Sequence, residues 1–309
     1  MKRAVIAAIM LLIASVCYAS SADENFRSAN RGGIFHPYKS GDKELQSLIS
    51  QYVPKFKTLT FSDDVTGLSI SYSIYIPESC GSLSGCPAVF FMADGSSTGK
   101  VPEYSLTQGL GGLVWCRDDC VVIVPSFPSV VLDDHNGFVE SEYVELAGRF
   151  VRWCAGHYGL NERRMYATGQ SMGCMTWLVL AARYPDMFTA SMFVSGQWDI
   201  SALKGLLSQK FVYIASAGDP KASAGMNEVV DMFRDSPNDG FSVFTEVDAK
   251  DPDLYFADSQ PVYFVMFRKG TTLPDGTEGG YSEHMTSFDY AYRMESARKW
   301  LLSQTKEDK

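Results

Sequence analysis

The sequence predicts an α/β protein whose mostly parallel central sheet is flanked by helices. Short, nearly all-apolar runs recur along the chain, and segments with helical spacing separate several of them. Strands that are apolar throughout are typical of parallel sheets covered on both faces, and their alternation with helices is typical of α/β folds. The sequence contains neither an internal repeat nor a second globular region, so we expect one domain over residues 55–309.

The expected strands follow one another from residue 57 onward. Two alternating runs, KTLTF and SYSIYIP, predict an antiparallel edge of the sheet. The apolar runs that come after them predict its parallel part. These runs are PAVFFMA, CVVIVP, RMYATG, SMFVSG, FVYIASA and VYFVMF.

Helical spacing appears between these strands and again at the end of the chain. Residues 143–154 repeat apolar side chains at helical intervals, and Gly156 and Gly159 are available to end that helix. A second set with the same spacing predicts a C-terminal helix: Tyr290, Met294, Ala297 and Leu301.

The first 54 residues are expected to precede the domain. Residues 1–22 combine a basic start, an apolar run too short for a membrane-spanning helix and small residues near their end, as a cleaved signal peptide does. Residues 23–54 are mostly polar and predict an N-terminal strap. One short stretch of this strap has an apolar helical face, formed by Leu45, Leu48, Ile49 and Tyr52. We therefore expect a secreted or periplasmic protein.

Cysteine usage agrees with export. The chain has seven cysteines, and loss of Cys17 with the signal peptide would leave six. An even number in an exported protein predicts disulfides. Six cysteines allow about 15 pairings. Spacing favours Cys80 with Cys86, Cys116 with Cys120, and Cys154 with Cys174.

The net charge excludes some partners. It is -9, from 27 basic and 36 acidic residues. An acidic chain without a basic stripe argues against nucleic acid and against an anionic membrane as partner. The four histidines are scattered and the cysteines lack zinc-site spacing, so we expect neither a metal nor a cofactor.

The stretch GQSMG places Ser171 where a predicted strand becomes a predicted helix. A serine at such a turn is held on a sharp corner, above the N-terminus of the following helix. That geometry suits attack on a carbonyl carbon. A small-residue turn also explains the pentapeptide, so the other residues of the site must decide between the two readings.

Two such residues follow later strands. Asp219 comes directly after FVYIASAG, and His284 lies after the last strand. A serine hydroxyl needs an imidazole to take its proton, and a carboxylate to orient that imidazole. The order Ser171, Asp219, His284 is the order expected of a hydrolase with a nucleophile elbow. The backbone N–H of Met172 is the expected first donor to the oxyanion.

These segments resemble a known family. RMYATGQSMGCMTW, AGDPKA and GGYSEHMTSFDYAY are similar to the esterase and predicted-peptidase group of α/β-hydrolases, which includes polyhydroxybutyrate depolymerase-like and feruloyl esterase-like enzymes. The resemblance covers roughly residue 54 to the end, and it implies an α/β-hydrolase fold. In that group the loop after the third strand usually begins with His-Gly. Here Ala93 and Asp94 stand at those positions, and an ungapped alignment makes Gly95 the second oxyanion donor.

We expect a secreted serine hydrolase that cleaves short-acyl or hydroxycinnamoyl-type carboxylic esters, small or polymer-linked, through an acyl-enzyme on Ser171. Gln170 and Trp198 are the expected substrate contacts. The stretch 197–210 is one short helix rather than a large lid, so the site should be open. A serine peptidase of the prolyl-oligopeptidase type and a non-catalytic binding protein of the same fold remain alternatives, and the oligomeric state is left open.

Overall fold

The computed structural model describes residues 39, 41–237, 240–252, 254–274 and 282–306. The expected signal peptide, Cys17 and the strap as far as residue 38 lie outside the described residues. Among the helices that are described, none is both long enough and apolar enough to cross a membrane.

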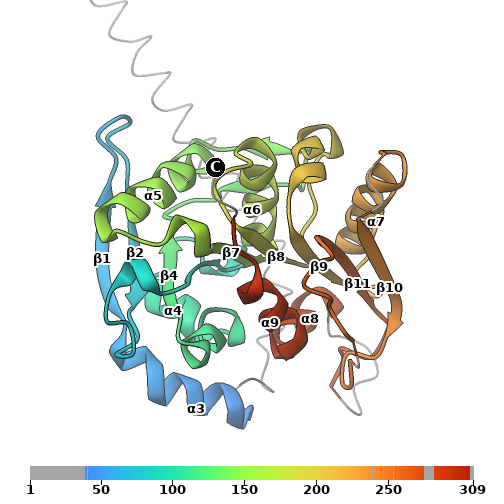
Figure 1. The fold of residues 1–309 in the computed structure, drawn as a ribbon, viewed down its shortest axis with the longest axis horizontal. Helices are drawn as coiled ribbons and strands as arrows, with labels where there is room; N and C mark the ends of the chain where they lie inside the picture. Colours follow the sequence, from blue (N-terminus) through green and yellow to red (C-terminus); the bar gives the residue numbers. More distant parts are fainter. Residues whose placement is uncertain (1–38, 40, 238–239, 253, 275–281, 307–309) are drawn as a thin grey trace, which may run out of the picture. The chain divides into compact units, whose positions relative to one another are not determined.

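A nine-stranded sheet forms the centre of the unit that begins at Pro37 (Figure 1). Its strand order is β1-β2-β4-β3-β7-β8-β9-β11-β10. Strands β1 and β2 are antiparallel to each other and β2 is antiparallel to β4, whereas all later pairs are parallel. The predicted antiparallel edge and parallel centre are both present. The nine strands are β1 (Lys57–Ser62), β2 (Ser69–Tyr75), β3 (Ala88–Met92), β4 (Val121–Ser126), β7 (Met165–Gln170), β8 (Ala190–Val194), β9 (Phe211–Ser216), β10 (Phe241–Val247) and β11 (Val262–Phe267).

Helices cover both faces of this sheet and create two separate cores. One core packs α5, α6 and α7 against the sheet, and the other packs α3, α4, α8 and α9 against its opposite face (Figure 1). Strands β3, β4, β7, β8, β9 and β11 are buried along their whole length, which explains why their sequences are apolar throughout. The helices are α3 (Lys43–Tyr52), α4 (Pro102–Thr107), α5 (Tyr143–Tyr158), α6 (Met172–Arg183), α7 (Pro220–Arg234), α8 (Glu283–Arg293) and α9 (Glu295–Ser303).

The expected C-terminal helix is in fact two helices. Met294 ends α8 in an extended conformation, with φ -63° and ψ 90°, and α9 starts at the next residue. Each helix is amphipathic, so the apolar spacing alone does not reveal the break. The long helix before the nucleophile ends as predicted, with Gly159 in the left-handed conformation at φ 60°.

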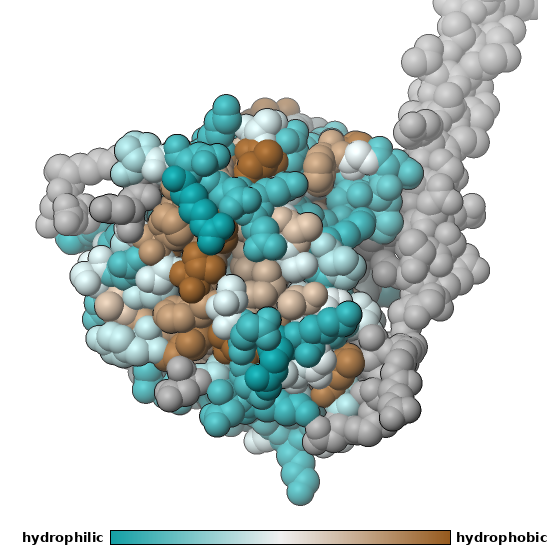
Figure 2. All heavy atoms as spheres, turned by 90° about the vertical axis from the view of Figure 1, so that its right-hand side faces the viewer, coloured by the Kyte–Doolittle hydropathy of each residue, from teal (hydrophilic) through white to brown (hydrophobic). Residues whose placement is uncertain are grey.

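Two short elements were not expected from the sequence. Strand β10 is the edge strand next to β11, and only its last residue is buried. Figure 2 looks onto this side of the sheet and shows hydrophobic residues in small groups among hydrophilic ones. A two-stranded hairpin, β5 (Leu132–Asp133) and β6 (Val139–Glu140), interrupts the connection from β4 to α5.

The predicted disulfides are confirmed for one pair. Cys80 and Cys86 are bonded, with Cα atoms 5.9 Å apart. The other two predicted pairs are wrong, because all four cysteines are free and buried. The Cys120 thiol faces the carbonyl of Asp118, and the Cys174 sulfur is packed beneath Gly196. Short spacing in the sequence does not show whether two thiols point toward each other, so it predicted one pair correctly and two pairs wrongly.

Candidate active site

Ser171 sits on a strained corner between β7 and α6. Its φ of 52° and ψ of -119° are rarely adopted by a residue with a side chain. Its N–H donates to the carbonyl of Val194 at 3.0 Å, and its own carbonyl accepts from Met175 at 2.9 Å. The corner is thus held by the neighbouring strand on one side and by the helix on the other.

Glycines let the backbone approach this corner closely. A Cβ on Gly173 would lie 2.1 Å from the carbonyl oxygen of Met92, and one on Gly196 would lie 2.8 Å from that of Ser171. A Cβ on Gly169 would lie 2.6 Å from the backbone of Gly173. These three positions have room for a hydrogen atom alone. Packing therefore explains both glycines of the GQSMG motif, Gly169 and Gly173, as well as Gly196 on the neighbouring loop.

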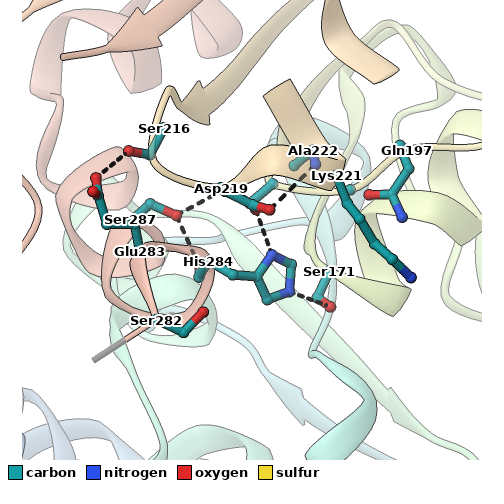
Figure 3. Close-up of polar contacts among 12 residues, drawn as sticks. Ser171, Gln197, Ser216, Asp219, Lys221, Ala222, Ser282, Glu283, His284 and Ser287 are labelled. Carbon is teal, nitrogen blue, oxygen red and sulfur yellow. Dashed lines mark hydrogen bonds and ion pairs between the residues drawn. The ribbon is translucent and has the colours of Figure 1, made fainter. Parts of the chain in front are cut away.

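The structure brings Ser171, His284 and Asp219 into one chain of hydrogen bonds (Figure 3). The Ser171 hydroxyl lies 2.8 Å from His284 Nε2, and His284 Nδ1 lies 2.5 Å from Asp219 Oδ2. The Asp219 side chain is 4% exposed and that of His284 is 28% exposed. The carboxylate is therefore shielded, whereas the imidazole reaches solvent beside the serine.

Helix α7 and its cap fix the carboxylate. Asp219 is the N-cap residue of α7, and its Oδ1 accepts from the N–H of Ala222 at 3.3 Å. Pro220 follows at the first helical position, where it removes no helical hydrogen bond. One carboxylate oxygen thus caps the helix, while the other remains for His284.

Helix α8 fixes the imidazole through two sets of contacts. Ser287 donates to the carbonyl of His284 at 2.9 Å, and its hydroxyl is 2.8 Å from that of Ser195, at the end of β8. The second set involves Glu283, which is 6% exposed and whose carboxylate is turned away from the serine (Figure 3). Its carboxylate accepts from the Ser216 hydroxyl at 2.6 Å, the Gly270 N–H at 3.0 Å and the Thr272 hydroxyl at 3.2 Å.

The expected oxyanion donors lie at the starts of two helical turns. Met172 is the first residue of α6, and Gly95 is the first residue of a 3-10 turn. The first N–H groups of a helical turn have no acceptor within it. Asp94 caps the 3-10 turn by accepting from the N–H of Ser96 at 2.9 Å, and its other oxygen accepts from the Gln170 amide at 2.8 Å.

The structure places the two expected substrate contacts inside the protein. Gln170 is 3% exposed and is bound to Asp94, so it supports the loop after β3 instead of facing a ligand. Trp198 is also 3% exposed, but it carries the ring of Phe138 at a centroid distance of 5.0 Å. Phe138 is 50% exposed and is therefore the aromatic residue that solvent reaches.

Part of the chain is similar in sequence to known esterases. Residues 135–246 match a family described as "Putative esterase". Acetylxylan esterase A of Aspergillus ficuum is 27% identical over 175 residues, which make up 53% of this chain and 52% of that protein. Acetylxylan esterase A of Talaromyces purpureogenus is 28% identical over 149 residues, or 44% of this chain and 35% of that protein. The chain thus spans about half the length, or less, of these curated relatives.

Solved structures decide the fold. A thermostable esterase superimposes with a TM-score of 0.66 at 20% identity, over 83% of this chain and 64% of that one. This chain has the α/β-hydrolase fold. An S-formylglutathione hydrolase from Agrobacterium tumefaciens superimposes on this chain with a TM-score of 0.51 at 10% identity, over 81% of this chain and 95% of that one. The predicted fold class is confirmed.

Two residues near the candidate site could not be predicted from the sequence. Phe138 belongs to a hairpin too short to give an alternating pattern, and Glu283 looks like an ordinary helix N-terminal acid beside His284. Asp133, Asp134 and His135 of the same hairpin place ligand atoms within 4.8 Å of one another. Asp134 already binds Gln197 and Lys221, and we assign no metal site to this exposed group.

Proposed function

We propose that this protein is a serine esterase that hydrolyses carboxylic esters through an acyl-enzyme on Ser171. The observation that carries the proposal is the chain of hydrogen bonds from the Ser171 hydroxyl through His284 to the shielded carboxylate of Asp219. Two similarities also support the proposal: residues 135–246 match an esterase family, and relatives of the chain are named acetylxylan esterase A.

The reaction follows from these contacts. His284 Nε2 takes the proton from the Ser171 hydroxyl as the oxygen attacks the ester carbonyl, and Asp219 stabilises the resulting imidazolium. The N–H groups of Met172 and Gly95 donate to the oxyanion. His284 then returns the proton to the leaving alcohol, and a water molecule releases the acid from Ser171 by the same steps in reverse order.

The site favours short or flat acyl groups. The segment after Trp198 forms two 3-10 turns, Ile200–Ala202 and Lys204–Ser208, instead of the one short helix that we expected, so residues 197–210 provide no helical lid. Binding of a long acyl chain depends on apolar cover, since burial contributes about 0.8 kcal/mol for each CH₂, and residues 197–210 do not form a helical cover of that kind. We infer acetyl or hydroxycinnamoyl-type esters, and we place the enzyme outside the cytoplasm on the basis of residues 1–22 and the Cys80–Cys86 disulfide.

Replacement of the nucleophile tests the proposal. Ser171→Ala is expected to lower kcat for ethyl acetate and methyl ferulate by at least roughly a thousandfold, because it removes the attacking oxygen. A fluorophosphonate should label the wild type on Ser171 and leave the variant unlabelled. Near wild-type turnover in a folded variant, as judged by circular dichroism, would refute the assignment.

A further inference from the structure

The tip of the β5–β6 hairpin is fastened beside the candidate active site. The Asp134 carboxylate accepts from the Gln197 amide and from the Lys221 ammonium, the latter at 2.9 Å. Gln197 follows Gly196, which packs against the backbone of Ser171. Lys221 comes two residues after Asp219. The hairpin is therefore bound to the loop after β8 and to the first turn of α7, both on the β8–β9 side of Ser171.

The same hairpin carries an aromatic side chain, Phe138, that is exposed to solvent and packs on a buried tryptophan. Phe138 is 50% exposed, and its ring is tilted by 58° against Trp198, which is itself buried. Polar side chains lie on either side of this pair in the chain: Trp198 directly follows Gln197, and Asp134, which binds Gln197 and Lys221, belongs to the same hairpin as Phe138. An exposed apolar ring near hydrogen-bonding side chains matches a ligand that has one apolar face and hydrogen-bonding groups around its edge.

We propose that Phe138 is the stacking platform for a sugar ring in the alcohol part of the ester, with Gln197 and Lys221 binding the sugar hydroxyls. The inference rests on the proposed function and names its substrate class, a short-acyl ester of a carbohydrate. A sugar ring offers C–H groups on its face and hydroxyls at its edge. A long acyl chain in the same place would strip water from the polar groups of Gln197 and Lys221 without replacing their hydrogen bonds.

The order of the strands assigns this platform to the alcohol and not to the acyl group. Ser171 follows β7, and the loop with Gly95 follows β3 on one side of it. Gln197 and Asp219 follow β8 and β9 on the other side, the side that also carries His284. The ester carbonyl oxygen faces the oxyanion donors, and the leaving oxygen faces the imidazole that protonates it. The alcohol therefore extends over the β8–β9 side.

Substrates that share an acetyl group but differ in the alcohol test this proposal. We expect Phe138→Ala to lower the ratio of kcat/KM for an acetylated xylo-oligosaccharide to kcat/KM for ethyl acetate by about tenfold, the effect of one lost aromatic contact. Phe138→Trp should retain the ratio, because an indole keeps the stacking face. Tyr255→Ala, which removes an aromatic side chain that is 82% exposed and outside the site, should leave it unchanged.

Two results would overturn the inference. One is an unchanged ratio in Phe138→Ala; the other is a larger effect of this variant on methyl ferulate relative to methyl acetate, which would assign the ring to the acyl group. Binding of the acetylated xylo-oligosaccharide to Ser171→Ala, with and without Phe138→Ala, measured by calorimetry, gives a readout without turnover. Failure of the wild type to hydrolyse ethyl acetate would instead refute the proposed function.

Discussion

At position 173 a methyl group would have no room, because it would lie 2.1 Å from the carbonyl oxygen of Met92. The neighbouring loop carries Asp94 and Gly95, so this contact joins the helix of the candidate nucleophile to the loop of the candidate second oxyanion donor. The close approach at Gly173 thus sets the distance between the helix that follows Ser171 and the loop that carries Gly95.

Gly173→Ala is therefore expected to harm both stability and rate. Moving the Met92 carbonyl should lower the free energy of unfolding by about 2 kcal/mol and reduce kcat more than it raises KM. Gly156→Ala is the matched control, since it lies in α5 with nothing within 4 Å of the added Cβ. It should raise the free energy of unfolding by about 0.5 kcal/mol. Urea unfolding and steady-state kinetics measure both, and equal effects of the two variants would contradict the packing argument.

At the scale of elements, Glu283 ties α8 to the ends of two strands. Its carboxylate binds Ser216 at the end of β9 and Gly270 and Thr272 after β11. Gly218, next to Asp219, lies directly against it: a Cβ there would be 1.8 Å from Glu283 Oε1. The contact thus links the loop that carries Asp219 to the helix that carries His284.

This link predicts that the two positions are coupled. Gly218→Ala should push the carboxylate out of place and lower kcat by at least about tenfold, or 1.4 kcal/mol of activation free energy. In a Glu283→Ala background the obstruction is gone, so the same Gly218→Ala change should cost less than about twofold. Glu283→Gln, which keeps the shape, should retain more activity than Glu283→Ala. If the loss of kcat in the double variant equals the product of the losses in Gly218→Ala and Glu283→Ala alone, the contact plays no part in positioning His284.

At the scale of the whole molecule, one sheet separates two cores, and each core contains two free cysteines. Cys154 and Cys174 lie in the core of α5, α6 and α7, whereas Cys116 and Cys120 lie in the opposite core. Burial raises the pKa of all four thiols, so the reactive thiolate is suppressed in the folded state.

We expect these four thiols to become reactive together. The two cores lie on opposite faces of the same strands. Unfolding of one core therefore removes strands that the other core needs, and we expect both to unfold together. Alkylation at increasing urea concentrations, mapped peptide by peptide with mass spectrometry, should give one midpoint for all four. Cys80 and Cys86 should react only after reduction. A lower midpoint for Cys116 and Cys120 than for the other pair would show that the two faces unfold separately.

The sequence predicted what depends on apolar pattern and on chain order. The buried strands and the Ser171, Asp219, His284 order are local or sequential signals, and the structure brings these three residues together. Contacts between distant segments have no such signal. Phe138 packs on Trp198, and Glu283 binds Ser216, which is 67 positions away in the chain. The buried position of Gln170 likewise depends on Asp94, 76 positions away, in another loop at the end of a strand.

Strand β10 has a consequence for how molecules meet one another. In the described part of the chain it is the last strand of the sheet, and its pairing with β11 shifts register between Phe244 and Val247. Glu246, within this bulge, has a φ of 57° and is exposed. A kinked edge that carries a charge is a poor template for a strand from a second molecule. We therefore expect the β10 edge to resist pairing with a strand of a second molecule, even at high protein concentration.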